Sequence, residues 1–190
     1  MLKKSMQDLQ RKTVEEFRAA EKSPVVVVLD NIRSMHNVGS VFRTADAFLI
    51  DSICLCGYTP QPPHRDIQKT ALGATETVNW TYFPSTLDAV LQLKSTGFGI
   101  YAVEQAAGSL RLDDIETVPG EKIALVFGNE VNGVDQAVMT HCDGCIEIPQ
   151  LGMKHSLNIS VAAGIVLWEI MRVRIPALLP ATNSTTHEHD

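Results

Sequence analysis

The order of hydrophobic and polar positions predicts that strands and helices alternate along almost the whole chain. Uninterrupted apolar runs predict buried strands at 25–31, 52–58, 78–83, 98–104, 122–128 and 145–149. Apolar residues at helical spacing predict helices at 38–49, 85–96, 134–141 and 157–173. Ser85 is the expected N-cap of the second helix, and Gly97 is expected to end it.

Continuous Val/Ile/Leu runs that alternate with helices are typical of an α/β domain, in which helices cover both faces of a parallel sheet. We expect this domain at 23–175. The Pro/Ser/Thr-rich segment 176–190 is expected to be a disordered tail. Residues 1–22 are expected to form an amphipathic arm that packs on this or another subunit, because apolar residues recur there at roughly helical spacing: Leu2, Met6, Leu9 and Phe17.

Length and composition fit one globular domain. The chain has 190 residues, of which 45% are apolar and 20% charged, enough to bury a core without disulfide or metal crosslinks. No window reaches the roughly 18 uninterrupted apolar residues of a membrane span. The opening MLKKSMQDLQRK lacks the apolar stretch of a secretory signal. We therefore expect a cytoplasmic protein without a membrane partner.

The net charge of −6 by itself argues against a nucleic-acid partner. The acidic residues are concentrated, however, since nine acids and two bases lie between Glu104 and Glu147, a local balance of −7 that leaves +1 for the remainder. Bases elsewhere could face a phosphate chain or simply be solvated: Lys3, Lys4, Arg11, Lys12, Arg33, Arg43, Arg65, Lys69, Lys154, Arg172 and Arg174. The charge pattern thus permits a nucleic-acid partner without indicating one.

Four cysteines form two close pairs, Cys54 with Cys56 and Cys142 with Cys145, the second pair beside His141. Zinc binding would require the fold to bring both pairs together. Packing roles are favoured, because the first pair lies in an apolar predicted strand and the second flanks an Asp-Gly turn. We therefore expect no metal site.

Three segments combine glycines and polar residues at points where a predicted strand ends. The first is NIRSMHNVGSVFRTADAF, at 31–48. Asn37 and Gly39 are expected to start its helix, and Arg43 falls within the first two turns, near the ligand-binding edge of an open sheet. The alternative is that Asn37 is only a helix cap and Arg43 a solvated surface residue.

The second segment, ALVFGNEVNGV, runs from a strand into a turn with two glycines, which permit a tight bend and a close approach to a ligand. It is neither a dinucleotide fingerprint nor a P-loop. The third, IEIPQLGMKHSLNISVAAGIVLWEI, has an irregular loop followed by a helix. That helix carries a stripe of small residues that would let another backbone come near: Ser160, Ala163, Gly164 and Leu167. Each of these two segments could also be an ordinary connection between a strand and a helix, with no functional role.

In this order and spacing, the three segments resemble the motifs of the SpoU/TrmH class of SPOUT-superfamily RNA ribose methyltransferases, over about 25–174. FGNEVNG followed by IPQLGMKHSLNISVAAG is the most specific part. The resemblance implies a deep C-terminal trefoil knot, although chains are in general expected not to thread their own loops. It also implies S-adenosylmethionine as cofactor, RNA as substrate, and a homodimer in which the first motif of one subunit completes the site of the other.

The resemblance implies site residues position by position. The cofactor is expected against the main chain at Gly128, Asn129, Glu130, Ile148, Gly152, Ser156 and Leu157. The implied catalytic residues are Asn37, Arg43, Glu130, Ser156 and Asn158. The expected RNA contacts are Arg33, Arg43, Arg65 and Lys154.

Two roles are open for Arg43. The class is usually described with this arginine as the general base that removes the proton of a ribose 2'-hydroxyl, oriented by Asn37. A guanidinium titrates five or more pH units above neutrality, so removing its proton at neutral pH costs roughly 7 kcal/mol or more. The alternative is that the guanidinium stays charged, grips the substrate phosphate and stabilises the developing alkoxide, while solvent accepts the proton.

GNEVNG and SLNISVAAG resemble the guanosine-modifying tRNA branch of the class more than the branch that acts at the anticodon wobble base. We therefore expect a tRNA substrate, methylated at a D-loop guanosine, with ribosomal RNA as the alternative. A catalytically inactive RNA-binding relative is a further alternative, which the Asn37 and Arg43 pair disfavours. An unrelated nucleotide-binding enzyme is disfavoured because phosphate-loop glycines are missing.

Overall fold

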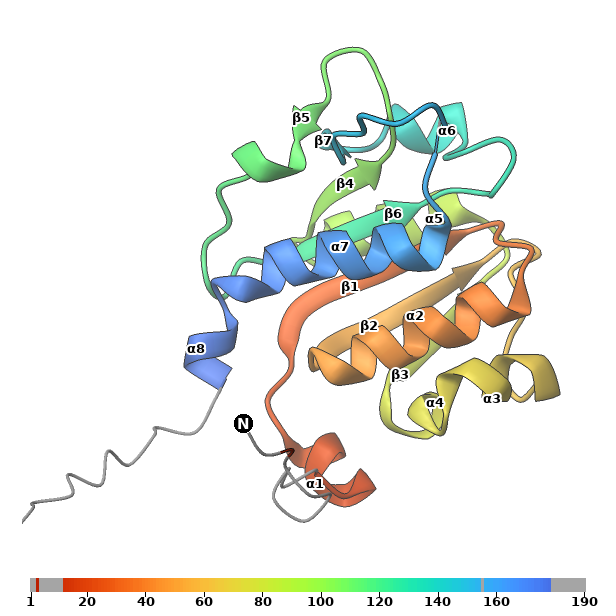
Figure 1. Cartoon of the computed structure of the whole chain (residues 1–190), viewed down its shortest axis with the longest axis vertical. Coiled ribbons are helices and arrows are strands. Elements are labelled where there is room, and N and C mark those ends of the chain that lie inside the picture. The colour runs from red at the N-terminus through yellow and green to blue at the C-terminus, as the bar shows by residue number, and fades with distance from the viewer. Residues whose placement is uncertain (1–2, 4–11, 155, 179–190) are drawn as a thin grey trace, which may run out of the picture.

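The computed structural model describes residue 3, residues 12–154 and residues 156–178. Within them, seven strands form one sheet in the order β3-β2-β1-β6-β4-β7-β5, and every neighbouring pair is parallel (Figure 1). The strands are β1 (Ser23–Asp30), β2 (Ile50–Cys56), β3 (Asn79–Phe83), β4 (Gly99–Val103), β5 (Leu110–Arg111), β6 (Ile123–Phe127) and β7 (Gly144–Glu147). The parallel sheet expected from the sequence is confirmed.

Helices cover both faces of this sheet, as expected. One face carries α2 (Met35–Ala47), α3 (Arg65–Ala71), α4 (Ala74–Thr77) and α7 (Ile159–Arg172). The other carries α5 (Thr86–Ser95) and α6 (Gln136–Met139). The chain also forms α1 (Val14–Ala19), the 3-10 helix η1 (Leu112–Asp114) and α8 (Ile175–Leu178).

The central strand explains why the predicted strands read as unbroken apolar runs. Val25, Val27 and Leu29 of β1 pack against the face that carries α2 and α7, whereas Val26 and Val28 pack against the face that carries α5. All five side chains are buried. Each such side chain contributes about 1.5–3 kcal/mol by leaving water, so both faces of β1 demand apolar residues.

The six predicted strands and four predicted helices are all present, with shifted ends. Helix α2 begins at Met35, because the Ser34 side chain caps it by accepting a hydrogen bond from the Asn37 backbone N–H. The expectation that Asn37 starts the helix, or only caps it, is therefore wrong. Ser85 does occupy the N-cap of α5, but its side chain makes no capping hydrogen bond. Helices α3, α4 and α8, the 3-10 helix η1 and strand β5 were not predicted, whereas α1 lies within the arm where helical spacing was expected.

The expected N-terminal arm is only partly described. Leu2, Met6 and Leu9 lie outside the described residues. Phe17, on α1, is buried in the core of this chain, and Arg18 donates to the Glu76 carbonyl. At the other end, residues 176–178 of the expected tail belong to α8, and residues 179–190 are outside the description.

The small-residue stripe on α7 is divided between the core, where α7 packs beside α2, and the surface. Ala163 and Leu167 are buried against the core, but a Cβ on Gly164 would have nothing within contact distance. Val161, Ile165 and Trp168 are exposed along the same helix. No helix in the described part of the chain is both long and apolar enough to cross a membrane.

Candidate active site

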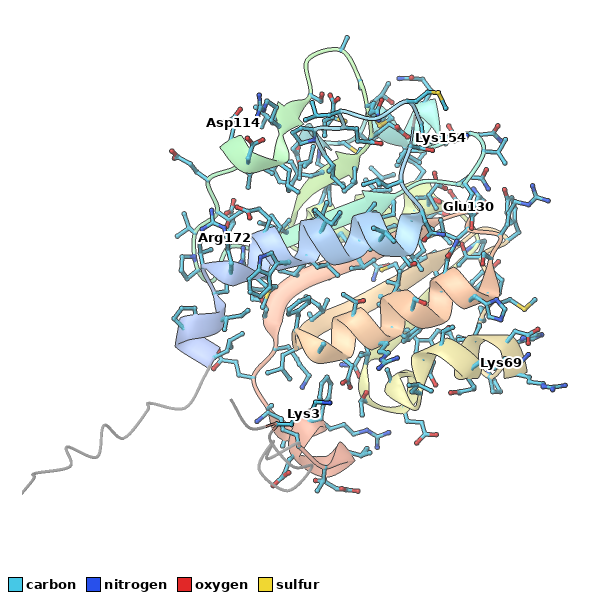
Figure 2. All side chains as sticks on the ribbon, viewed as in Figure 1. Lys3, Lys69, Asp114, Glu130, Lys154 and Arg172 are labelled. Carbon is cyan, nitrogen blue, oxygen red and sulfur yellow. The ribbon has the colours of Figure 1, made fainter. Side chains whose placement is uncertain are left out.

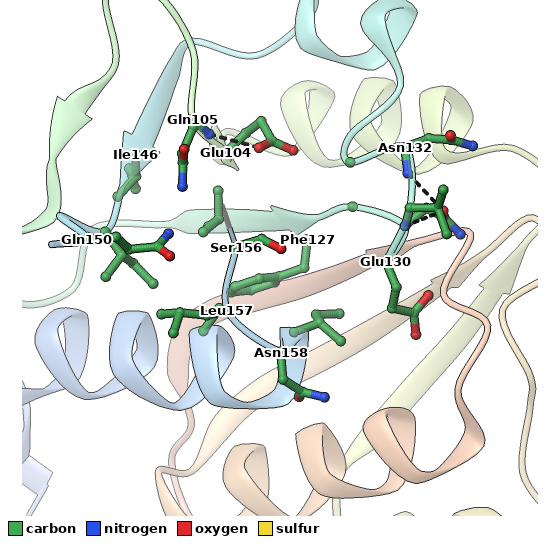
Figure 3. A pocket seen from close by; sticks show the side chains of 18 residues that line it. Glu104, Gln105, Phe127, Glu130, Asn132, Ile146, Gln150, Ser156, Leu157 and Asn158 are labelled. Carbon is green, nitrogen blue, oxygen red and sulfur yellow. Dashed lines mark hydrogen bonds between the residues drawn. The ribbon is translucent and has the colours of Figure 1, made fainter. Parts of the chain in front are cut away.

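A cleft of about 650 Å³ opens at the edge where the parallel strands end, between the loops that follow β4, β6 and β7 (Figure 3). It has an apolar floor and a rim of main chain and polar side chains. The lining residues are Val103, Glu104, Gln105, Phe127, Gly128, Asn129, Glu130, Val131, Asn132, Gly133, Ile146, Ile148, Gln150, Ser156, Leu157, Asn158, Ile159 and Ala162. Ligands of open α/β sheets bind at this edge, and the volume is that of a small-molecule site.

Glu130 joins the loop after β6 to the loop between β1 and α2. One carboxylate oxygen accepts a hydrogen bond from the Arg33 backbone N–H at 2.9 Å. The other accepts from the Ser34 backbone N–H at 3.0 Å and from Asn37 Nδ2 at 3.1 Å. The carboxylate therefore closes one side of the cleft through three donors that lie more than 90 residues away in the sequence.

The third segment is tied to the same cluster. Asn158 is the N-cap of α7, where its Oδ1 accepts from the Ser160 backbone N–H. Its Nδ2 donates to Asn37 Oδ1 at 3.1 Å. Asn37 thus donates to Glu130 and accepts from Asn158, so one side chain connects all three segments that the sequence singled out.

Hydrogen bonding keeps Glu130 ionised. Partial burial raises the pKa of its carboxyl group, but the donors from Arg33, Ser34 and Asn37 outweigh burial and hold the pKa below its ordinary value. A carboxylate that is charged at neutral pH and already holds three donors is suited to anchoring the cleft and to attracting a cation. It is poorly suited to act as a base near pH 7.

The turn after β6 is built around Asn129. Its Oδ1 accepts from the backbone N–H groups of Val131 and Asn132, and its main chain forms a two-way bridge with Gly133. A Cβ on Gly128 would overlap the backbone of Gly133, so this position requires glycine. The turn therefore presents main chain to the cleft, with few side chains in the way.

A second carboxylate, Glu104, lies at the end of β4. It accepts from the backbone N–H groups of Gln105 at 2.8 Å and Val134 at 3.3 Å. Gly133 has a φ of 69°, and a Cβ there would strike this carboxylate. In the described part of the cleft, Glu104 and Glu130 are the charged lining residues, so the cavity is negative.

Residues 24–168 match the SpoU rRNA Methylase family. The chain belongs to this family. It is 33% identical over 173 residues to a tRNA (guanosine(18)-2'-O)-methyltransferase of Thermus thermophilus, covering 90% of this chain and 86% of the relative. It is 30% identical to a 23S rRNA (guanosine-2'-O-)-methyltransferase of Vibrio vulnificus, covering 90% and 68%. Other curated relatives are longer, and the chain spans 64% of one and 41% of another.

A solved family structure has the same architecture. An AdoMet-bound rRNA methyltransferase of Sinorhizobium meliloti superposes with a TM-score of 0.74 at 27% identity, over 90% of this chain and 63% of that chain. The resemblance read from the three motifs is thereby confirmed as family membership.

Most of the residues that the family motifs single out come together. Gly128, Asn129, Glu130, Ile148, Ser156, Leu157 and Asn158 line the cleft, and Asn37 reaches it through Glu130 and Asn158. Gly152 does not line the cleft, and a Cβ there would lie in open space. Among the described residues, nothing around Gly152 requires glycine.

Arg43 stands apart from this cluster. It lies on α2 and is exposed, and it makes no hydrogen bond or ion pair with the described residues. It lies six positions after Asn37 on the helix, a rise of about 9 Å. The hydrogen-bonded cluster formed by the described residues is therefore closed without Arg43.

The predicted RNA contacts Arg33, Arg65 and Lys154 are exposed. Lys154, Glu130 and Lys69 lie along one side of the molecule in Figure 2. The suggestion that Arg174 could face a phosphate chain is wrong. Arg174 is 3% exposed and donates to the Glu121 carbonyl, and burial lowers the pKa of its guanidinium.

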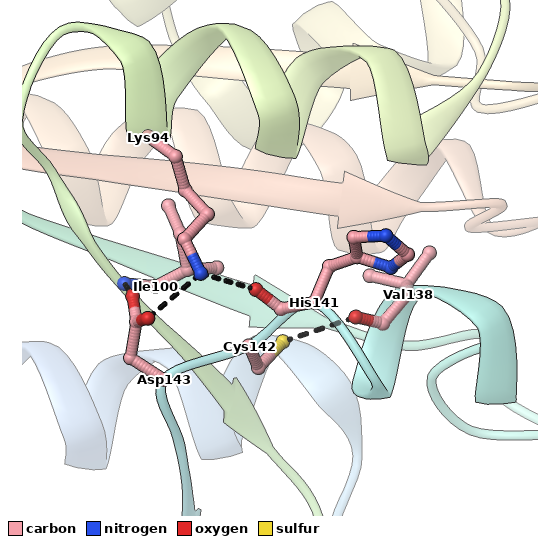
Figure 4. Close-up of polar contacts among 6 residues, drawn as sticks. All are labelled: Lys94, Ile100, Val138, His141, Cys142 and Asp143. Carbon is pink, nitrogen blue, oxygen red and sulfur yellow. Dashed lines mark hydrogen bonds and ion pairs between the residues drawn. The ribbon is translucent and has the colours of Figure 1, made fainter.

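Neither cysteine of the second pair lines the cleft, although Cys145 Sγ donates to the carbonyl of the lining residue Glu104 at 3.3 Å. Figure 4 shows the contacts around Cys142. Cys142 Sγ donates to the Val138 carbonyl, and Lys94 bridges the His141 carbonyl and Asp143. Burial raises the pKa of the Cys142 thiol to about 11, which disfavours the thiolate that a metal ligand requires. Among the described residues, no group of three or more His, Cys, Asp or Glu is placed to hold a metal ion.

Sequence reasoning missed Glu104, Gln105 and Gln150, which line the cleft from the loops after β4 and β7. Figure 3 shows the Gln105 side chain directed toward Ser156. Their position directly after predicted strands was a usable signal, because parallel strands end at one edge. The strand order, which places β4 between β6 and β7, could not be read from the chain.

Proposed function

We propose that this protein is an S-adenosylmethionine-dependent methyltransferase that modifies the 2'-hydroxyl of an RNA ribose. The observation that carries the proposal is the chain of hydrogen bonds from Asn158 through Asn37 to Glu130 at the cleft. It joins the three family motifs in one wall. Relatives named for ribose 2'-O-methylation of tRNA and rRNA support the reaction class.

The cleft fits S-adenosylmethionine in size and in charge. Its apolar floor, with Phe127, Ile146 and Ile148, suits an adenine ring. The Gly128 turn offers main-chain groups for the ribose hydroxyls. Glu104 and Glu130 make the cavity favourable for a cation. When bound, the cofactor supplies an electrophilic methyl group on a positively charged sulfur.

The residues of this chain would position the acceptor. Asn37 and Asn158 hold the wall rigid, Ser156 presents a hydroxyl to the cleft, and Glu130 anchors the loop after β6. Arg43 would come from the partner subunit, since in its own subunit it lies outside the cluster. There it would grip the RNA phosphate beside the 2'-hydroxyl, or take the proton of that hydroxyl.

We propose a homodimer that buries the exposed face of α7. Val161, Ile165 and Trp168 recur at helical spacing, and Gly164 between them leaves room for a close approach. An arm at 1–22, a domain at 23–175 and a tail at 176–190 remain the proposed division of the chain. We also propose the trefoil knot, which the family likeness supports. A cytoplasmic location stays a prediction.

The substrate we propose is tRNA at a D-loop guanosine, with ribosomal RNA as the alternative. The test supplies radiolabelled S-adenosylmethionine with unmodified tRNA or ribosomal RNA, followed by mapping of ribose methylation. Transfer to tRNA but not to rRNA is expected. Isothermal titration with S-adenosylmethionine separates an enzyme from an inactive RNA-binding relative, which would give no saturable heat.

The role of Arg43 is tested by its variants. Arg43→Ala should be nearly inactive under either hypothesis, while Arg111→Ala, an exposed arginine paired with Asp113, should keep full activity. A rate that still rises above about pH 9 and is abolished by Arg43→Lys supports the general base. Substantial activity of Arg43→Lys supports a charged guanidinium that grips phosphate and stabilises the alkoxide.

A further inference from the structure

An exposed aromatic ring is held beside the cleft by the same turn that forms its wall. Tyr58 follows β2 and is 60% exposed. Its backbone N–H donates to Asn31 Oδ1 at 3.2 Å, and its hydroxyl accepts from Asn129 Nδ2 at 2.8 Å. Asn129 immediately precedes Glu130 in the wall of the cleft. The ring is therefore fixed at its backbone and at its tip, while much of its surface faces solvent.

The orientation of the Asn129 amide is set by its other partners. Its oxygen must serve the backbone N–H groups of Val131 and Asn132, and its nitrogen also donates to the Asn31 carbonyl. The Tyr58 oxygen consequently accepts, which leaves the hydroxyl hydrogen available to an outside acceptor.

The surroundings of Tyr58 suit a polyanion. Arg33 follows β1 at the same edge of the sheet, and Arg65 begins α3 shortly after Tyr58 in the chain. Both are exposed, and neither side chain makes an ion pair or hydrogen bond with the described residues. The nearby Asp66 is paired with Lys69 at 2.6 Å, and the charged Glu130 carboxylate is engaged by its three donors on the cleft side of the turn.

We propose that Tyr58 is the stacking surface for an unpaired nucleobase of the RNA substrate, next to the nucleotide that is methylated. Single-stranded RNA is recognised by bases that stack on aromatic rings while basic side chains bind the phosphates. A ring that is already immobilised loses little entropy when a base stacks on it. The inference rests on the proposed function, because it assumes RNA at this edge of the sheet.

The experiment measures binding of the full chain to two probes, a single-stranded oligoadenylate and an abasic oligomer with the same phosphates. Tyr58→Leu should weaken binding of the oligoadenylate about 10-fold, the size of one base–aromatic stack. It should leave binding of the abasic oligomer unchanged. Tyr58→Phe, which keeps the ring, should bind oligoadenylate within about twofold of wild type. S-adenosylmethionine affinity should be the same in all three proteins.

Tyr82→Leu is the matched control, since Tyr82 is an exposed tyrosine on the edge strand β3, pairs with Leu55 of β2, and makes no side-chain hydrogen bond with the described residues of the cleft wall. The proposal is overturned if Tyr58→Leu binds oligoadenylate like wild type, or if Tyr58→Phe loses as much as Tyr58→Leu, which would assign the effect to the hydroxyl contact with Asn129. Because RNA binding is measured apart from methyl transfer, a wild type that binds RNA but transfers no methyl group refutes the proposed function and not the stacking.

Discussion

Replacing Glu130 with glutamine tests whether its carboxylate holds the cleft together. The amide oxygen of glutamine can still accept from Ser34 and Asn37, but the amide nitrogen would face the Arg33 backbone N–H, so that hydrogen bond is lost. The hydrogen bonds from Ser34 and Asn37 remain but are weaker, because their acceptor is no longer charged. Fully desolvated, these changes would cost about 4 kcal/mol.

Glu130 is exposed to solvent, which roughly halves that cost, to about 2 kcal/mol. For a chain of this size, such a loss lowers Tm by about 4–8 °C. Thermal unfolding followed by circular dichroism measures this shift. Glu116→Gln is the control, because Glu116 is exposed and makes no hydrogen bond or ion pair with the described residues. Its Tm should move by less than about 2 °C.

The pH dependence gives the sharper test. The pKa of Glu130 is lowered in the folded protein, so its contribution is complete above the unfolded pKa of about 4.3 and is lost as pH falls through the folded value. Glutamine does not titrate. The Tm difference between wild type and Glu130→Gln should therefore be largest near pH 7 and shrink below about pH 4.5. No difference at pH 7, or one that persists unchanged in acid, would refute the reasoning.

Three further predictions concern other parts of the chain. Gly133→Ala should destabilise the protein by at least about 1 kcal/mol and weaken S-adenosylmethionine binding in calorimetry, because its φ is 69° and the new Cβ strikes Glu104; unchanged affinity would contradict this. Asp30→Ala should cost about 3 kcal/mol in urea unfolding, since Asp30 is 1% exposed and accepts from Thr86 at 2.5 Å; a loss below about 1 kcal/mol would count against that role. Alkylation of Cys142, followed by peptide mass spectrometry, should quicken about tenfold per pH unit up to about pH 11, and a plateau by pH 9 would be inconsistent with the raised pKa.

The sequence was sufficient for the sheet and its helices because β1 and β6 are buried on both faces and therefore read as unbroken apolar runs. It was insufficient for α3 and α4, whose buried residues are few: Ile67, Ala71 and Ala74. Such short helices are stabilised by contact with α2 rather than by a hydrophobic pattern of their own that could be read from the sequence.

For the candidate site too, the sequence motifs predicted some of the residues and missed others. Glu130, Ser156 and Asn158 were found because their motifs are distinctive, and the structure brings them to one cleft. Glu104 was not found, because its carboxylate enters the site only through the order of strands, which places β4 beside β6 and β7. The side chain of Tyr58 likewise reaches Asn129 across the end of β1, a relation that no local pattern contains.

The hydrogen bonds from Asn37 have a consequence for biosynthesis. They reach Glu130, 93 positions later, and Asn158, 121 positions later. A nascent chain that has emerged from the ribosome only as far as β6 can form its first helices, yet it lacks part of the cleft wall. We therefore expect the proposed cofactor to bind only after α7 has been translated and docked, so that truncated translation products would not sequester the methyl donor.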